Sequence, residues 1–288
     1  MKYFRSRIKK VIESKIIGNR TMSRFFRYAM ADQGILFFRE FNDHELLYYP
    51  HDIIGLILTE QGEYQRDSVR FIAEFFRKHA YSLHESWILE LGGNIGTHSI
   101  YFCKEFENVK VLTVEADPEN ISVLQRNVDL NNLDDQVAIV GGAVSNYDGT
   151  IELVRNYFNR GGTSVSGDKS MHRGSVFSTE SMRVDSLLCM REIDPAKIGL
   201  VWIDVEGHEL EVFEGMENLV SKSKPPVFFE YTPGETSRNS RLLDLVFEHY
   251  NSVWISGSGG FDKISRDQLS LIAESVDVFA VCDQMYTP

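Results

Sequence analysis

The chain has 288 residues, 43% of them hydrophobic, which suits one large globular domain or one domain with an extension. Its formal net charge is −12 at pH 7, and because an acidic surface repels phosphates, this charge argues against a broad nucleic-acid footprint. Its three cysteines, at positions 103, 189 and 282, are too far apart in sequence for a disulfide framework or a CxxC-type zinc or redox site.

Residues 1–30 differ in charge from the rest of the chain. They carry nine Lys or Arg residues and one acid, so their net charge is +8 and that of the remainder is −20. Phe4, Ile8 and Ile16 recur at roughly helical spacing, which predicts an amphipathic helix. Such a helix can pack on its own domain or lie on an anionic membrane. With no apolar stretch long enough to cross a bilayer and no secretory signal, we expect a cytoplasmic protein, with peripheral contact at the inner membrane face as the alternative.

The segment up to residue 84 is predicted to be an N-terminal extension. It combines the basic helix with short strands over 37–52 and a further helix over 66–79. In that helix Val69, Ile72 and Phe76 follow the i, i+3, i+4 spacing of a single buried face. The predicted division is therefore 1–84 and 85–288.

From residue 86 onward, short apolar stretches alternate with amphipathic ones, a pattern typical of βαβ units and of a sheet covered on both faces. Helices are expected over 97–106 and from Pro118, with Asp117 as the cap. The segment 156–175, rich in Gly and Ser, is predicted to be a loop. The expected strands are 87–91, 109–115, 137–144, 199–207, 226–231, 252–255 and 276–282.

The stretch ILELGGNIGTHSIYF, residues 88–102, is a candidate cofactor turn. Its glycines, Gly92, Gly93 and Gly96, lack the G-x-G-x-x-G spacing of a dinucleotide site, and no Walker Gly-Lys-Ser/Thr follows. Two acids, Glu90 and Glu115, stand at the ends of successive predicted strands. A carboxylate can accept hydrogen bonds from ribose hydroxyls or face a cation. A nucleoside that bears a cation, such as S-adenosylmethionine, fits this pattern.

Four motifs in order resemble those of the FkbM-type S-adenosylmethionine-dependent methyltransferases. They are ILELGGNIGTHSIYF, VLTVEADPENISVLQRNVDLNN, GGAVSNYDGTIEL and VWIDVEGHELEVFEGMENLV, followed by PPVFFEY, and the resemblance covers residues 49–231. The family more commonly has Ala where this chain has Gly93. The resemblance implies a class I methyltransferase fold: an α/β, Rossmann-like, seven-stranded and mostly parallel sheet with helices on both faces, preceded by the N-terminal helical extension.

The same resemblance implies a set of cofactor-binding residues. Asp204 would face both the sulfonium and the acceptor, Glu115 would bind the ribose, and the turn after the first strand would hold the methionine half. The full set is Glu90, Gly92, Gly93, Asn94, Gly96, Glu115, Ala116, Asp117, Gly142, Ala143 and Asp204.

Four residues are candidates for catalysis: Asp204, Glu206, His208 and Glu230. An alcohol acceptor must lose a proton, and His208 is a reasonable base at neutral pH. Asp204 or Glu206 could serve instead if burial raises its pKa. A divalent cation held by Asp204, Glu206 and Glu230 is a further alternative, although no metal site is predicted.

Three residues outside these sets are weaker candidates. Tyr64 and Arg66 could close over the cofactor, and Arg160 could meet an anionic acceptor. Ordinary packing and a solvated loop are the competing interpretations.

The sequence therefore predicts an S-adenosylmethionine-dependent O-methyltransferase acting on a hydroxyl of a sugar, glycan or related small metabolite. The alternatives are a different acceptor, either a nucleic acid or a secondary metabolite, and a non-catalytic Rossmann-like binding module. Nucleic acid is not expected as a partner, because the acidic body is unfavourable and no Asn/Asp-Pro-Pro-Tyr-type motif follows the strand over 199–207. No oligomeric state follows from the sequence.

Overall fold

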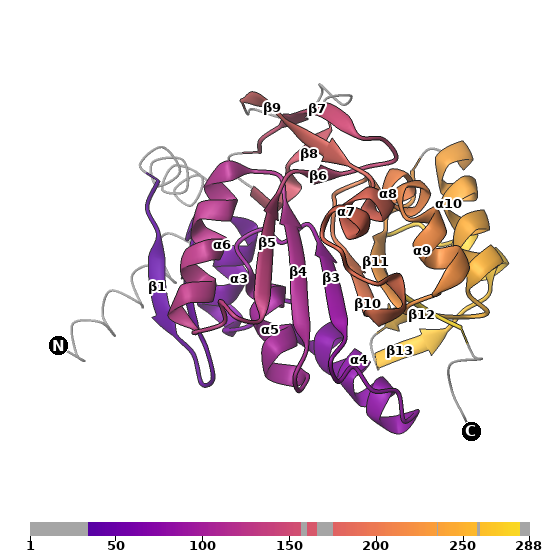
Figure 1. Ribbon diagram of the computed structural model, residues 1–288, viewed down its shortest axis with the longest axis horizontal. Helices are drawn as coiled ribbons and strands as arrows, with labels where there is room; N and C mark the ends of the chain where they lie inside the picture. The colour runs from indigo at the N-terminus through magenta and orange to yellow at the C-terminus, as the bar shows by residue number, and fades with distance from the viewer. Residues whose placement is uncertain (1–33, 157–159, 166–174, 235, 258–259, 283–288) are drawn as a thin grey trace.

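The computed structural model describes residues 34–156, 160–165, 175–234, 236–257 and 260–282 (Figure 1). Its centre is an eight-stranded sheet in the order β13-β12-β14-β11-β10-β3-β4-β5. The strands are β3 (Trp87–Leu91), β4 (Lys110–Glu115), β5 (Val137–Gly141), β10 (Ile198–Ile203), β11 (Val227–Tyr231), β12 (Ser252–Gly257), β13 (Gly260–Lys263) and β14 (Val276–Val281).

The strands from β11 to β5 pair in parallel, whereas β14 is antiparallel to both β11 and β12. This arrangement confirms the predicted α/β fold with a mostly parallel sheet. The seven expected strands are all present, and β13 adds an eighth at the sheet's edge, where it pairs with β12 as a hairpin. Its four residues, GFDK, carry too short a pattern to be recognised as a strand from sequence.

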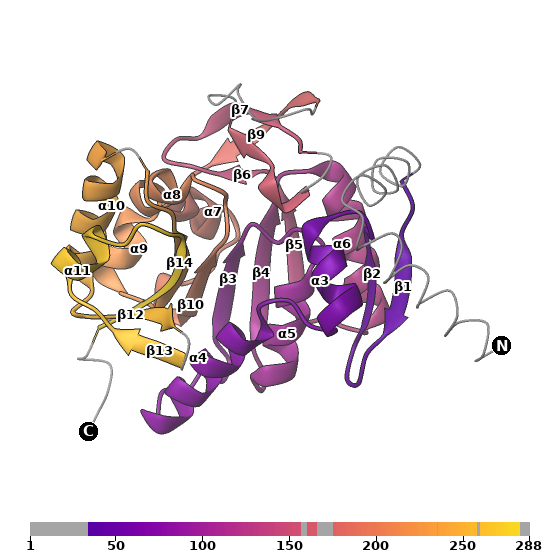
Figure 2. The same cartoon turned by 180° about the vertical axis from the view of Figure 1, so that it is seen from behind.

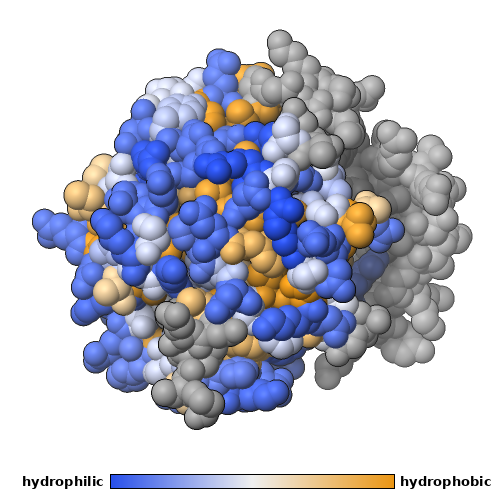
Figure 3. Space-filling view, turned by 90° about the vertical axis from the view of Figure 1, so that its right-hand side faces the viewer, coloured by the Kyte–Doolittle hydropathy of each residue, from blue (hydrophilic) through white to orange (hydrophobic). Residues whose placement is uncertain are grey.

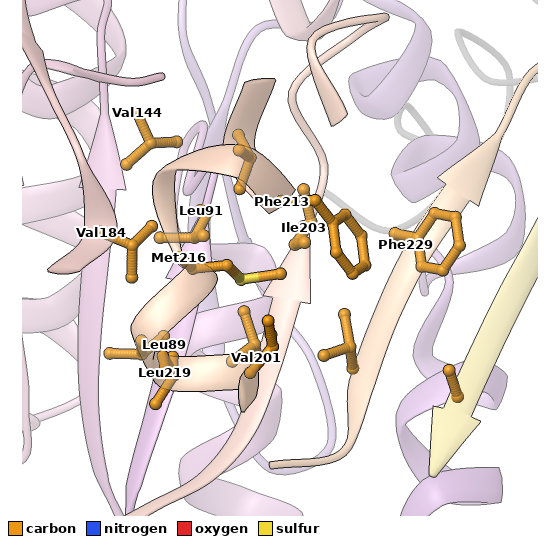
Figure 4. Close-up of a cluster of buried hydrophobic side chains, with 14 of the residues drawn as sticks. Leu89, Leu91, Val144, Val184, Val201, Ile203, Phe213, Met216, Leu219 and Phe229 are labelled. Atoms are coloured by element: carbon orange, nitrogen blue, oxygen red, sulfur yellow. The ribbon is translucent and has the colours of Figure 1, made fainter. Parts of the chain in front are cut away.

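Helices cover both faces of the central sheet (Figures 1 and 2). One face carries α3 (Ile53–Gln61), α4 (Arg66–Lys78), α5 (Thr97–Glu105) and α6 (Pro118–Leu130); the other carries α7 (Val184–Met190), α8 (Glu209–Gly215), α9 (Glu217–Lys222), α10 (Thr236–His249) and α11 (Arg266–Ser270). Because successive strand residues point to opposite faces, Ile88 packs toward α4–α6 and Leu89 toward α7–α9. Figure 4 shows the second of these clusters, in which Met216 and Leu219 lie against Leu89 and Val201.

The described part of the N-terminal extension packs on the sheet. A hairpin of β1 (Phe37–Glu40) and β2 (Glu45–Tyr48) precedes α3 and α4. The side-chain amide of Asn127 on α6 accepts a hydrogen bond from Leu47 N–H and donates to the Leu47 carbonyl. The division at residue 84 stays a prediction, and the expected basic helix over 1–30 lies outside the described residues.

A small second sheet lies above the central one in Figure 1, in the order β6-β9-β7-β8. Its strands are β6 (Ala143–Val144), β7 (Gly149–Val154), β8 (Ser164–Val165) and β9 (Val176–Met182). Of the two 3₁₀ turns in the described residues, η2 (Arg160–Gly162) lies between β7 and β8, and η3 (Pro195–Lys197) precedes β10. The expected strand 137–144 is thus split into β5 and β6. Part of the expected loop 156–175 forms η2 and β8, and its residues 157–159 and 166–174 lie outside the described ranges.

Hydrophilic residues cover most of the face shown in Figure 3, and hydrophobic residues reach that surface in places between them. Within the described ranges, none of the helices combines the length and the apolar character that crossing a bilayer requires.

Candidate active site

An open cleft lies where β3, β4 and β10 end, between the central sheet and the small second sheet. About 890 Å³ of empty space lies within it, the solvent at its mouth included. Ligands of open α/β sheets bind at this edge. Of the predicted site residues, those that line the cleft are Gly92, Asn94, Glu115, Ala116, Gly142, Ala143, Asp204, Glu206 and His208.

Gly92 brings two strand ends together at the floor of the cleft. Its φ of +98° is a conformation that favours glycine, and a Cβ at this position would lie 1.8 Å from the carbonyl oxygen of Asp204. Asp204 N–H in turn donates to the carbonyl of Leu91 at 2.8 Å. The next residue but one, Asn94, also has a positive φ, of +47°. The turn therefore fixes the position of Asp204 relative to the cofactor loop.

Glu115 ends β4 and is buried at the side of the cleft. Its two carboxylate oxygens accept hydrogen bonds from the backbone N–H groups of Asn94 and Asp117, each at 2.8 Å. Burial raises the pKa of this carboxyl to about 7. Oε1 also accepts a longer hydrogen bond from the side-chain amide of Asn120, at 3.4 Å, whereas Oε2 keeps a lone pair for a further donor. Glu115 can therefore accept a hydrogen bond from a ribose hydroxyl, as predicted.

Glu90, predicted to contact the cofactor, is not one of the residues that line the cleft. It pairs in register with Thr113, two residues before Glu115, and therefore lies deeper in the sheet. Ser99 Oγ donates to its Oε2, and its Oε1 has no hydrogen-bond partner among the described residues. Burial raises the pKa of Glu90 to about 7.

This buried carboxyl predicts a pH dependence of stability. Because its pKa is higher in the folded chain, the stability that the protonated form contributes is lost as the pH rises through about 7. Glu90→Gln stays neutral, so its melting temperature should fall less than that of the wild type between about pH 5 and 8. Thermal denaturation at several pH values across this range measures the two melting temperatures, and Glu152→Gln, a change at an exposed position, is the control. Equal slopes for wild type and Glu90→Gln would contradict the expectation.

Four further predicted residues support the site from outside the cleft lining. A Cβ on Gly93 would lie 2.0 Å from Thr113 Oγ1, so the Ala that is commoner in the family would require Thr113 to move. Gly96 precedes the first residue of α5, and Asp117 caps α6 by accepting from Glu119 N–H. Glu230 stands near the end of β11, beside the cleft acids.

The cleft acids belong to a larger group of carboxyls that raise one another's pKa. Burial, followed by the charges of Glu206 and Glu230, raises the pKa of Asp204 well above its ordinary value. Burial and the charge of Glu230 raise the pKa of Glu206 to about 7. No described residue forms a hydrogen bond or ion pair with the side chains of Asp204, Glu206 or Glu230. These carboxyls are therefore available to a ligand.

His208 lines the cleft, but both of its ring nitrogens have partners. Nε2 lies 2.9 Å from Ser145 Oγ, and Nδ1 lies 3.4 Å from Glu211, whose carboxylate is paired with Arg238. Burial lowers the pKa of His208, so the neutral ring is favoured. In this arrangement the free carboxyls of Asp204 and Glu206 are better placed than His208 to accept a proton.

Of the three weaker candidates, Tyr64 and Arg160 line the cleft and Arg66 does not. Tyr64 lines the cleft, whereas Arg66 pairs with Asp43 and Glu105 away from it. Arg160 lines the cleft but is buried, with Nη1 2.7 Å from Glu119 and its guanidinium 4.1 Å from the Tyr49 ring centroid. Its charge is thus already paired.

Apolar side chains from the small sheet and α3 close the cleft, and sequence reasoning did not identify them. They are Ile53, Ile54, Ile151 and Leu153, together with Val165. Residues 150–153 alternate between exposed and buried, which indicates one apolar face, but no sequence signal shows that this face closes a cofactor site.

The alternative of a metal site receives no geometric support from the described ranges. No group of three or more His, Cys, Asp or Glu side chains within them has an arrangement that could hold a metal ion.

Comparison with known proteins identifies the family. A family model described as the methyltransferase FkbM domain matches residues 90–252. Methyltransferase sdnD of Sordaria araneosa is 30% identical over 175 residues, which cover 50% of this chain and 67% of that protein. Methyltransferase 1 of Beauveria bassiana (strain ARSEF 2860) is 26% identical over 149 residues, or 46% of this chain and 59% of that protein.

Among solved structures, methyltransferase FkbM from Methylobacillus flagellatus KT matches at 17% identity and a TM-score of 0.46. That match covers 75% of this chain and 48% of the solved one, so the chain spans about half of that protein's length. Because the family model spans more than half of the sequence, the chain belongs to the FkbM-domain methyltransferases, whose methyl donor is S-adenosylmethionine.

Proposed function

We propose that this methyltransferase methylates a hydroxyl group of a sugar, a glycan or a related small metabolite. The observation that carries the proposal is the pair of unpartnered carboxyls, Asp204 and Glu206, in the same cleft as Glu115. A hydroxyl is a poor nucleophile until it loses its proton, and a nearby carboxylate can accept that proton. Other acceptors, including secondary metabolites, remain the alternative.

The residues of the cleft fit S-adenosylmethionine. Glu115 would accept hydrogen bonds from the ribose hydroxyls, Asn94 and Ala116 would flank it, and the apolar residues Ile151 and Leu153 would cover the base. Gly92 leaves the backbone bare at the point where Asp204 approaches, so no side chain fills this part of the cleft. When bound, the cofactor supplies an electrophilic methyl group.

The remaining chemistry belongs to the chain's own residues. They must hold the acceptor oxygen in line with the methyl group, which supplies much of the rate acceleration. When the acceptor oxygen takes up the methyl group, its hydroxyl proton would pass to the Asp204–Glu206 pair. Glu206 is the better matched of the two, because a base with a pKa near 7 is both ionised and basic at neutral pH.

Cofactor binding is the first test of this assignment. In isothermal titration, S-adenosylmethionine should bind and NAD should not, and Glu115→Ala should weaken binding at least about tenfold, or about 1.4 kcal/mol. The exposed Glu152→Ala is the matched control and should bind like the wild type. Transfer of a labelled methyl group to a panel of sugars then tests the acceptor. If the wild type binds the donor but methylates no sugar, glycan or polyol, the proposed acceptor class is wrong.

We also propose that residues 1–30 make a peripheral contact with an anionic membrane. Their charge of +8 and their apolar spacing support it, and Phe37 and Phe38, which follow closely, are exposed on β1. The wild type should sediment with vesicles that contain phosphatidylserine and not with phosphatidylcholine vesicles. Replacing Lys9, Lys10 and Lys15 by Gln should reduce this sedimentation. Equal sedimentation with both vesicles would contradict the proposal.

A further inference from the structure

A bridge of four charged side chains joins the small second sheet to the start of α6. Arg155, the residue after β7, donates from Nε and Nη2 to the two carboxylate oxygens of Asp117, at 2.5 and 2.7 Å. Its Nη1 lies 2.6 Å from one oxygen of Glu119, and Nη1 of Arg160 lies 2.7 Å from the other. Two arginines thus alternate with two acids, and the charges of the bridge cancel.

Asp117 is the buried centre of this bridge. Its side chain has no exposed surface, whereas that of Glu119 is 48% exposed. Among the described residues, Arg155 is the one cation that pairs with Asp117. Removing one partner of a buried ion pair is strongly destabilising, because it leaves an uncompensated charge out of reach of water. The ionised form of Asp117 therefore depends on Arg155.

Asp117 connects the bridge to the cleft through its backbone. Its N–H donates to Glu115 Oε1 at 2.8 Å, and its carboxylate caps α6 by accepting from Glu119 N–H. Burial raises the pKa of Glu115, and the charge of Asp117 raises it further. A guanidinium held against Asp117 offsets that charge. Arg155 is thus placed to influence both the orientation of Glu115 and the charge beside it.

Arg160 extends the same bridge to the wall of the cleft, which it lines. Its N–H donates to Asp52 Oδ1 at 3.1 Å, and its guanidinium lies 4.1 Å from the Tyr49 ring centroid. Because Glu119 holds both arginines, η2 and the end of β7 are tied to the first turn of α6. This side of the cleft is therefore held against the turn that orients Glu115.

We propose that Arg155 is a positioning residue for the methyl donor: through Asp117 it fixes the backbone N–H that orients Glu115, and it offsets the negative charge beside that carboxylate. The inference rests on the ribose contact proposed above for Glu115, and it needs no assumption about the acceptor. It gives an arginine that is not one of the residues lining the cleft a part in holding S-adenosylmethionine.

The first experiment measures S-adenosylmethionine binding by isothermal titration without any acceptor. Arg155→Met should raise the dissociation constant at least about tenfold, the usual loss when a hydrogen bond to a charged group is removed. Arg155→Lys keeps the charge but not the two-pronged contact, so its affinity should lie between those of the wild type and Arg155→Met. Wild-type affinity in Arg155→Met would overturn the inference. If that variant does not fold, wild-type affinity in Arg155→Lys would do so.

Arg66→Met is the matched control. Arg66 also pairs with both oxygens of one aspartate, Asp43, and its side chain is 7% exposed against 12% for Arg155. Because this pair lies away from the cleft, Arg66→Met should lose stability but bind the donor like the wild type. An equal loss of affinity in both variants would show that any broken buried pair loosens the fold, and would overturn the specific part given to Arg155.

A second change separates the charge of Asp117 from a merely structural tie. Asn at position 117 keeps a side-chain oxygen that can cap α6 but carries no charge. Added to Arg155→Met, Asp117→Asn should restore affinity at least about threefold relative to Arg155→Met alone, because no uncompensated charge then remains beside Glu115. If the double variant binds no better than Arg155→Met, Arg155 does not act by offsetting that charge, and the inference is overturned.

Glu115→Ala, titrated in the same way, separates this inference from the proposed function. If Glu115→Ala weakens binding and Arg155→Met does not, the ribose contact stands and only the inference fails. If Glu115→Ala binds like the wild type, both fail. A panel of sugars that accept no methyl group would contradict the proposed acceptor alone.

Discussion

Glu206→Gln should lower kcat for methyl transfer by about 10²- to 10⁴-fold, the usual contribution of a general base. The amide keeps the size of the side chain but cannot accept the acceptor's proton. Cofactor binding should change far less, because Glu115, the predicted ribose-binding residue, keeps its backbone donors in this variant. Single-turnover methyl transfer with labelled donor, measured beside calorimetric binding, separates the two effects.

The pH profile distinguishes a base from a structural acid. Burial and neighbouring acids raise the pKa of Glu206 to about 7, so the fraction of its active, ionised form grows as the pH rises through that value. Wild-type kcat should therefore rise with pH through about 7, and this rise should disappear in Glu206→Gln. Since Asp204 and Glu206 are coupled, the observed pKa belongs to the pair.

Glu209→Gln is the matched control for that variant. Glu209 is buried nearby and burial raises its pKa to about 7 as well, but it is not one of the residues that line the cleft. Its carboxylate accepts a hydrogen bond from Gly207 N–H, a contact that the amide oxygen of Gln can retain. The kcat of Glu209→Gln should stay within a few-fold of the wild-type value. An equal loss in both variants would show that the acids act through the shape of the loop rather than as a base.

The sequence predicted best what depends on local pattern. The strand over 87–91 coincides with β3, and the helix over 66–79 ends one residue beyond α4, because apolar alternation and helical spacing are properties of a short window. Of the small second sheet, β6 was predicted only as the end of the strand over 137–144, and β8 and β9 were not predicted. The strands β6 and β8 have two residues each, and β6 pairs with β9 more than 30 residues away, so no local pattern shows that they form a separate sheet.

The candidate site was predictable to the extent that it follows strand ends. Glu115 and Asp204 line the cleft as expected, because each stands at the point where a parallel strand ends. Glu90 also stood at an apparent strand end, but its depth depends on the register between β3 and β4, which pairs it with Thr113. Register is set by contacts between segments distant in sequence. The same holds for Glu230, which lies directly opposite Asp277 across β11 and β14, an alignment that no single stretch reveals.

Gly92→Ala should lower the free energy of unfolding by roughly 3 kcal/mol or more and abolish methyl transfer, because two penalties add. A residue with a side chain pays about 1–2 kcal/mol for the left-handed conformation that Gly92 adopts at φ +98°. Its Cβ would in addition lie 1.8 Å from the Asp204 carbonyl oxygen, a clash that only movement of β3 away from β10 can relieve. That movement would displace Asp204 from the cofactor loop.

Gly207→Ala isolates the first of these penalties. Gly207 also has a positive φ, of +83°, and lies in the loop after β10, but a Cβ there would meet nothing within 4 Å. This variant should lose only about 1–2 kcal/mol in urea denaturation. The difference between the two variants measures the close contact of the strand ends. If both variants lose the same free energy of unfolding, the left-handed backbone conformation alone explains why position 92 is glycine. The position of Asp204 would then not depend on the missing Cβ at Gly92.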